Sequence, residues 1–217
     1  YPALFKKAIA PILAEGMPYR MTESDDCLKG VPGASDSFAS ALWALDYLHW
    51  WAAHGASGVN FHNTEWLTTD TVYYDPAADA LRIHPKAYAI KAFDLGCHGR
   101  VAPLTIASRG KLDLTAYAVW DTNDLYVTII DKDHGKDALP AAVTIRAIGF
   151  STGRVETMNL LPPDGNVGAT NGITLGGAPI TNHAPWRGRW RPLETAKSGC
   201  AIVVAAGSAA IVKIPAR

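Results

Sequence analysis

The sequence predicts an α/β segment followed by an all-β domain, with the boundary near residues 98–101. Two observations lead to this class. Helix and strand patterns alternate over the first 98 residues, whereas only short strand patterns separated by turn sequences occur from residue 99 onward. We therefore expect two domains, residues 1–98 and residues 99–217.

The first part contains three helix patterns and two strand patterns. Apolar residues recur at helical spacing, and Pro, Ser, Asp or Gly residues mark the ends of each helix. Pro11 should kink or shorten the first helix, because proline lacks a backbone N–H. The expected elements are helices over residues 2–15, 36–54 and 86–96, strands over 18–23 and 57–62, and a small hairpin within residues 73–83.

Two such strands cannot form a stable parallel sheet alone. A parallel sheet needs both faces covered and its edges paired. Residues 1–98 therefore match the last strands and helices of a (β/α)8 barrel, with the other strands upstream of residue 1. The expected partner is this upstream half, in the same precursor or in a second chain.

The second part is rich in Val, Ile, Leu, Thr and Tyr, with turn clusters between short runs. Regular short strands of this kind predict an antiparallel β-sandwich. The expected strands span residues 101–107, 112–120, 124–131, 141–148, 153–159 and 200–214.

Charge and cysteine usage exclude several classes of function. Twenty basic residues balance twenty acidic residues, so we expect neither nucleic acid nor an anionic membrane as partner. No apolar run is long enough to span a bilayer. The three cysteines lack metal-ligand spacing, so we expect no structural zinc and no cofactor. The chain opens with Tyr1 rather than Met, so its lack of a signal peptide says nothing against secretion.

Two expected strands end in residues suited to catalysis. In barrels of this type the catalytic groups lie at the carboxyl ends of the strands. One strand ends at Glu23, before a loop rich in Gly and Pro, and the other ends at His62. Each residue alone has a simpler explanation, as a solvated loop carboxylate or as a structural histidine.

A longer pattern adds specificity. Residues 20–62 resemble glycoside hydrolase family 79, which includes β-glucuronidases and relatives of heparanase. The resemblance rests on a strand ending in Glu, a Cys and a Gly-rich loop, the helix SDSFASALWALDYLHWWAAHG and the strand GVNFH. Residues 85–99 resemble the final barrel helix of that family, and residues 112–135 resemble its C-terminal β domain. The resemblance also implies a secreted or periplasmic protein that acts on a carbohydrate.

The resemblance implies that Glu23 is the nucleophile of a retaining glycosidase. It would attack the anomeric carbon, while a second carboxyl group about 5–5.5 Å away acts first as acid and then as base. In the family this acid/base is usually a Glu that follows Asn on an earlier strand. The sequence contains no Asn-Glu pair, and Glu15 and Glu65 are wrongly placed. We therefore expect the acid/base outside this chain.

The resemblance also implies substrate-binding residues. His62 matches a histidine that lines the sugar pocket, and Gly30 lies in the loop that holds the uronate carboxylate. Lys29 is a candidate cation for that carboxylate. Tyr88 is a candidate for stacking or a hydroxyl, with packing as its alternative.

Two departures from the family pattern stand beside Glu23. Leu28 replaces a Tyr that is common in glucuronidases, and Asp25-Asp26 replace Asn and Ser. Extra acids would disfavour an anionic sugar and could raise the pKa of Glu23. Two other hypotheses thus stay open: a carbohydrate-binding or accessory module, and a family member that has lost catalysis. The barrel-like strand ending in Glu favours the enzyme over the module.

Overall fold

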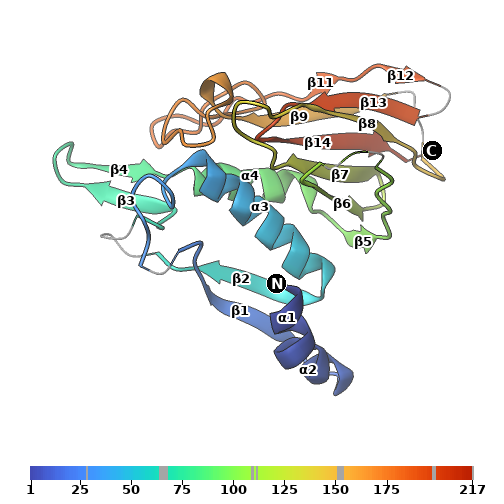
Figure 1. Ribbon diagram of the computed structural model, residues 1–217, viewed down its shortest axis with the longest axis horizontal. Helices are drawn as coiled ribbons and strands as arrows, with labels where there is room; N and C mark the ends of the chain where they lie inside the picture. Colours follow the sequence, from blue (N-terminus) through green and yellow to red (C-terminus); the bar gives the residue numbers. More distant parts are fainter. Residues whose placement is uncertain are drawn as a thin grey trace.

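The computed structural model describes residues 1–27, 29–63, 68–108, 110, 112–150, 154–196 and 199–216. These residues form a mixed α/β structure built in layers (Figure 1). A small parallel sheet lies on one side of a helix layer, and a large antiparallel sheet lies on the other side, backed by a third sheet. None of the described helices has the length and apolar character needed to cross a membrane.

The N-terminal helix is one helical run with a wide turn in its middle. It consists of α1 (Pro2–Leu4), the π-helical turn η1 (Phe5–Ile9) and α2 (Ala10–Ala14). The N–H of Ala10 donates to the carbonyl of Phe5. This wide turn directly precedes Pro11, which cannot donate in the regular helical pattern. The predicted disturbance at Pro11 thus takes the form of a π-turn.

Strands β1 (Tyr19–Ser24) and β2 (Ala56–Phe61) form the small parallel sheet. Among the described residues they pair only with each other. One face of this sheet contributes Tyr19 to an aromatic core with Tyr47 and Trp51 of the next helix, and the N-terminal helix packs against the same core. Both edges of the sheet lack a neighbouring described strand.

Helix α3 (Phe38–Ala53) crosses the middle of the molecule (Figure 1). It begins two residues later than expected, because its first amides are satisfied from another part of the chain. The N–H groups of Phe38 and Ala39 donate to the carbonyls of Ala169 and Val167, both at 2.8 Å. The helix ends at Ala53, one residue earlier than expected, and Gly55 follows with a positive φ of 86°, which suits the predicted helix stop.

The predicted hairpin and last helix are confirmed. Strands β3 (Val72–Asp75) and β4 (Ala80–Ile83) pair antiparallel, and helix α4 (Lys86–Gly96) follows them. Helix α4 packs beside α3, so the two helices together form the helix layer.

The large sheet has seven strands in the order β10-β9-β14-β7-β6-β5, with β11 also paired to β9. The expected strand 101–107 stops early, because Pro103 cannot donate to a strand ladder. The strands of this sheet are β5 (Arg100–Ala102), β6 (Leu114–Trp120), β7 (Asp124–Asp131), β9 (Glu156–Leu161), β10 (Thr174–Leu175), β11 (Arg191–Pro192) and β14 (Ser208–Pro215), with the short turn η2 (Pro163–Gly165) between β9 and β10.

The expected strand 200–214 is wrong in one respect, because the chain turns within it. Strand β13 (Gly199–Val204) belongs to a three-stranded sheet with β8 (Ala141–Ile145) and β12 (Thr195–Ala196), whereas β14 belongs to the large sheet. Gly207, with a φ of 59°, carries the turn between them. The uninterrupted apolar run in the sequence concealed this change of sheet.

The two faces of the large sheet are covered by different layers. Ala209 and Ile211 of β14 face the core shared with α3 and α4. Ala210, Val212 and Ile214 face the core shared with β13. A strand buried on both faces reads as a continuous apolar run, which explains why β14 does not show the usual alternation.

Candidate active site

Glu23 lies at the carboxyl end of β1 and faces solvent. The pairing of β1 with β2 shifts register between Met21 and Ser24. Residues of a regular strand alternate between its faces, so the shift places Ser24 in the buried layer, where its hydroxyl lies 3.0 Å from that of Tyr47. Glu23 remains outside, with 72% of its side chain exposed. The irregular strand end thus exposes a carboxylate that regular alternation would turn toward the core.

His62 follows β2 directly and lies beside Glu23. Its backbone N–H donates to the carbonyl of Ser24 at 3.1 Å, which extends the parallel pairing by one residue. Its Nδ1 atom lies 3.3 Å from Oε1 of Glu23. This geometry lets the imidazole, with Nδ1 as donor, hold the carboxylate in one orientation. The structure thus brings together the two strand-end residues that the sequence singled out.

Asp25 joins this pair. Among the described residues, Glu23, Asp25 and His62 form the one group with three potential metal-ligand atoms within 4.8 Å of one another. Nitrogen and carboxylate oxygen atoms suit zinc, although exposed acidic groups commonly occur without any ion. The same spacing places a second carboxyl group close to Glu23.

Asp26 belongs to a hydrogen-bond network with Ser40 and Thr69, which are both buried. Ser40 of α3 donates to its Oδ2 at 2.5 Å, and the hydroxyl of Thr69 donates to its Oδ1 at 3.0 Å. Burial acts to raise the pKa of Asp26, but the bond from Ser40 and the charge of Lys86 outweigh it, so its pKa lies below the usual range. Asp25 also reaches the hydroxyl of Thr69, at 3.4 Å, but of the two extra acids it is Asp25 that groups with Glu23.

Lys86 is the buried cation of this network. Its side chain is 0% exposed, and its Nζ donates to the carbonyl of Thr69 and, at 2.6 Å, to the Thr69 hydroxyl. The ammonium also lies 5.4 Å from the ring centre of Phe61. Burial lowers the pKa of Lys86, and the charges of nearby acids, Asp26 first, oppose this. Lys86 thus ties helix α4 to the loops that follow β1 and β2.

The loop carrying Lys29 and Gly30 lies against the loop after β2. Gly30 has a φ of 72°, and a Cβ there would lie 2.4 Å from the hydroxyl oxygen of Thr68. Gly30 is thus required by close packing as well as by its backbone conformation. Lys29 is exposed and also has a positive φ, 63°. Leu28 and Glu65 lie outside the described residues.

Tyr88 and Arg20 make contacts away from this pair. Tyr88 is buried in the core, and its hydroxyl accepts a hydrogen bond from the N–H of Ile180 at 3.0 Å. This contact corresponds to the packing alternative for Tyr88. The guanidinium of Arg20 donates to Oδ1 of Asn60 at 2.6 Å, across the strand pair.

Sequence reasoning missed Lys86 and Thr69. Lys86 is the first residue of α4 and shares a helix face with the buried Ala89. A lysine on an apolar face is the signal that could have identified it. Thr69 carries no such signal, because its role depends on a loop whose path the sequence does not define.

The fold is shared with glycoside hydrolases. A 4-O-α-L-rhamnosyl-β-D-glucuronidase from Fusarium oxysporum 12S matches with a TM-score of 0.76 and 18% identity, over 96% of this chain and 46% of that one. A family 51 α-L-arabinofuranosidase from Thermotoga petrophila matches with a TM-score of 0.67 and 12% identity, over 93% and 44% of the two chains. A family 30 endoxylanase from Clostridium papyrosolvens matches with a TM-score of 0.59 and 12% identity, over 100% and 45%.

These likenesses are of fold alone, because the identities are low. The chain spans less than half the length of these structures. A scan against models of protein families finds no match, and a search of curated proteins finds none either.

Proposed function

We propose that this chain is the nucleophile-bearing C-terminal part of a retaining glycoside hydrolase of the family 79 type. The observation that carries the proposal is the Glu23–His62 pair, held at the ends of two neighbouring parallel strands. Strand ends of this kind carry the catalytic groups of (β/α)8 enzymes. The likeness of fold to a glucuronidase and to other glycosidases supports it.

In the proposed reaction Glu23 attacks the anomeric carbon and forms a glycosyl ester, as the leaving group takes a proton from the acid/base carboxyl. The same carboxyl then removes a proton from water, which hydrolyses the ester and restores Glu23. His62 keeps the Glu23 carboxylate oriented for attack. In this proposal the acid/base belongs to the upstream half of the protein.

The proposed architecture has residues 1–98 as the last part of a (β/α)8 barrel and residues 99–217 as a β-sandwich. The unpaired edges of β1 and β2 support the first assignment, since upstream strands would cover them. The core shared by the large sheet and the three-stranded sheet supports the second.

The proposed substrate is a β-glucuronide or a related uronate glycoside, and the proposed location is outside the cytoplasm. Asp26 is hydrogen-bonded within the buried network, where the positive charge of Lys86 offsets its negative charge and weakens its repulsion of a uronate. Lys29 is exposed on the neighbouring loop and can supply a cation.

The test is an assay of the complete protein on an aryl β-glucuronide. Glu23→Gln keeps the shape of the side chain but removes its nucleophilic charge, so kcat should fall at least about 10³-fold. Glu15→Gln is the matched control, because Glu15 is exposed at the end of α2, before the opposite end of β1, and its variant should retain full activity.

Three outcomes count against parts of the proposal. Full activity of Glu23→Gln removes Glu23 as the nucleophile. Cleavage of a neutral glycoside, with no cleavage of the glucuronide, removes the uronate assignment. Sugar binding without hydrolysis, unchanged in Glu23→Gln, favours an accessory module instead.

A further inference from the structure

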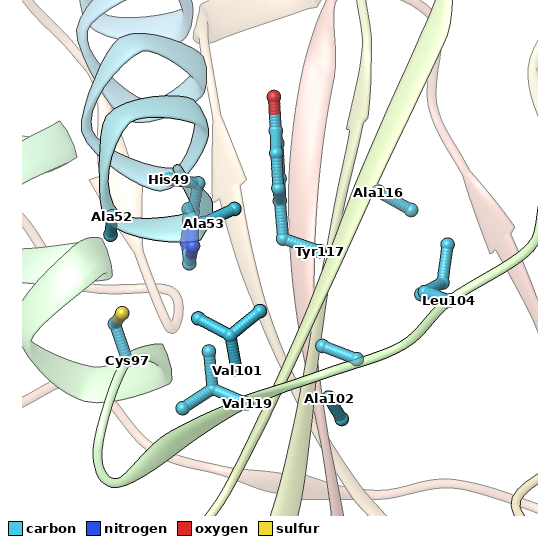
Figure 2. A pocket seen from close by; sticks show the side chains of 11 residues that line it. His49, Ala52, Ala53, Cys97, Val101, Ala102, Leu104, Ala116, Tyr117 and Val119 are labelled. Atoms are coloured by element: carbon cyan, nitrogen blue, oxygen red, sulfur yellow. The ribbon is translucent and has the colours of Figure 1, made fainter. Parts of the chain in front are cut away.

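The pocket beside helix α3 offers no carboxylate to a sugar. It lies between the ends of α3 and α4, strand β6 and the segment after β5 (Figure 2). None of the described residues that line it is a carboxylate, and the hydroxyl of Tyr117 already donates to Oδ1 of Asp46, at 2.7 Å. Recognition of sugar hydroxyls by a carboxylate therefore points back to the strand ends, where Asp25 lies close to Glu23 and His62.

Asp25 is the one residue of this strand-end group without a role in the proposed reaction. Its carboxylate has an oxygen within 4.8 Å of an oxygen of Glu23 and a nitrogen of His62. An O–H···O hydrogen bond spans about 2.7 Å, so one hydroxyl oxygen can lie within reach of two carboxylate oxygens up to roughly 5.4 Å apart. A single substrate hydroxyl therefore fits between Glu23 and Asp25.

A buried hydroxyl supports Asp25 from the segment after β2. Thr69 is 0% exposed, and its Oγ1 lies 3.4 Å from Oδ1 of Asp25 and 3.0 Å from Oδ1 of Asp26. Lys86 donates to the same Oγ1 at 2.6 Å, so the single hydrogen of the hydroxyl is directed to the carboxylates. Oδ1 of Asp26 also accepts the N–H of Cys27, at 2.7 Å. Thr69 can thus donate to Asp25 without leaving Asp26 unsatisfied.

The position beside the nucleophile identifies the substrate hydroxyl. In the proposed reaction Glu23 lies against the anomeric carbon, which in a pyranose is bonded to the ring oxygen and to C2. The ring oxygen carries no proton, so the 2-hydroxyl is the donor nearest to Glu23. Hydrogen bonds to this hydroxyl strengthen in the transition state of glycosidases. The carboxylate of a uronate is attached to C5, on the other side of the ring oxygen, so Asp25 can bind the 2-hydroxyl without lying against that charge.

We propose that Asp25 accepts a hydrogen bond from the 2-hydroxyl of the sugar that is transferred to Glu23, with Thr69 as its positioning residue. This inference rests on the proposed function and narrows its substrate class. The sugar must carry a free 2-hydroxyl, because a sulfate or another anionic group in that place would meet the charges of both Asp25 and Glu23.

The experiment uses the complete protein and the aryl glycoside that it cleaves best, which we expect to be the β-glucuronide, together with the 2-deoxy analogue of that glycoside. Loss of the hydroxyl should lower kcat/KM of the wild type about 30-fold more than that of Asp25→Ala, because only the wild type loses a hydrogen bond to a charged acceptor. The intrinsic difference in reactivity between the two substrates is the same for both enzymes and cancels. Asp137→Asn, in the exposed turn before β8, is the matched control and should behave as the wild type.

The positioning role of Thr69 is tested with the same pair of substrates. Thr69→Val keeps the shape but removes the hydroxyl, and should reduce the 30-fold difference to about fivefold, whereas Thr69→Ser should keep it. A purely structural role for Thr69 would lower kcat/KM equally for both substrates. Should Asp25→Ala or Thr69→Val not fold, Asp25→Asn keeps the shape and removes the charge, and the wild type should then exceed it about tenfold.

Two results would overturn the inference while leaving the proposed function intact. The first is an equal effect of the missing hydroxyl on the wild type and on Asp25→Ala. The second is a defect of Asp25→Ala that is confined to substrates with poor leaving groups, which would make Asp25 the acid/base. Absence of hydrolysis by the complete wild-type protein would contradict the proposed function itself, and the inference with it.

Discussion

The small parallel sheet and the large antiparallel sheet differ in how their strands are paired and buried. Strand β14 has β7 on one side and β9 on the other, and both of its faces are covered. Strands β1 and β2 pair only with each other among the described residues, and β1 exposes Arg20, Thr22 and Glu23. The chain thus satisfies one sheet internally and leaves the other with open edges.

This difference indicates a division of roles. The large sheet and the helix layer provide a rigid base, because their apolar side chains are buried from both sides. The polar residues that suit catalysis lie on the sheet with the least internal pairing. Lys86 and Thr69 make up for part of the missing strand pairing, since they hold the loops at the ends of β1 and β2 to helix α4.

The largest expected effect tests the rigidity of the large sheet and the helix layer. Ile211→Ala should lower the free energy of unfolding by about 4 kcal/mol, because Ile211 is 1% exposed in the centre of β14. Val203→Ala is the control, since Val203 on β13 is 66% exposed, and should change it by less than about 0.5 kcal/mol. Urea unfolding measures both. Equal losses would contradict the assignment of β14 as the central strand.

The second effect tests the contact by which Lys86 joins helix α4 to the loops at the ends of the small parallel sheet. Lys86→Met removes the buried cation and leaves the carboxylate of Asp26 without its compensating charge, which should cost about 3 kcal/mol. Lys91→Met on the same helix removes an exposed ion pair with Asp94 and a contact with the ring of Trp186, and should cost less than about 1 kcal/mol. Thermal unfolding of the two variants measures both losses. An unchanged stability of Lys86→Met would contradict a stabilising role for the Lys86 network.

The third effect is a pH dependence at the junction of α3 and the large sheet. His49 has a pKa of about 3 in the folded chain and about 6.5 when unfolded, so between these values only the unfolded chain binds the proton. Stability should therefore fall as pH falls, by about 2 kcal/mol between pH 7 and pH 5. His49→Phe should remove this contribution to the pH dependence of the free energy of unfolding. Urea unfolding at both pH values tests it, and an unchanged slope in the variant would locate the effect elsewhere.

Sequence patterns predicted the elements more successfully than the contacts between them. The helix over residues 86–96 and the strand over 124–131 match the structure, because local periodicity and turn residues determine such boundaries. The turn at Gly207 was missed, because the apolar run continues through it. The start of α3 was misplaced, since its first amides bond to residues far along the chain.

For the site, the strand-end rule singled out Glu23 and His62, and the structure places them together, because the carboxyl ends of neighbouring parallel strands meet. It did not separate Asp25, which lies with Glu23 and His62, from Asp26, which bonds to Ser40, although both aspartates also reach the hydroxyl of Thr69. That separation depends on Ser40, which approaches Asp26 from helix α3. Side chains that act through tertiary contacts leave little trace in local sequence.

The most direct test of Glu23 is covalent capture of the intermediate in the complete protein. A 2-deoxy-2-fluoro-β-glucuronide with a good leaving group forms the glycosyl ester faster than water removes it, because fluorine slows both steps and the leaving group restores the first. Peptide mass spectrometry should find the sugar on the peptide that contains Glu23, and fragmentation should assign it to that carboxylate. A label on Asp25, or on any other carboxyl group, would contradict the account.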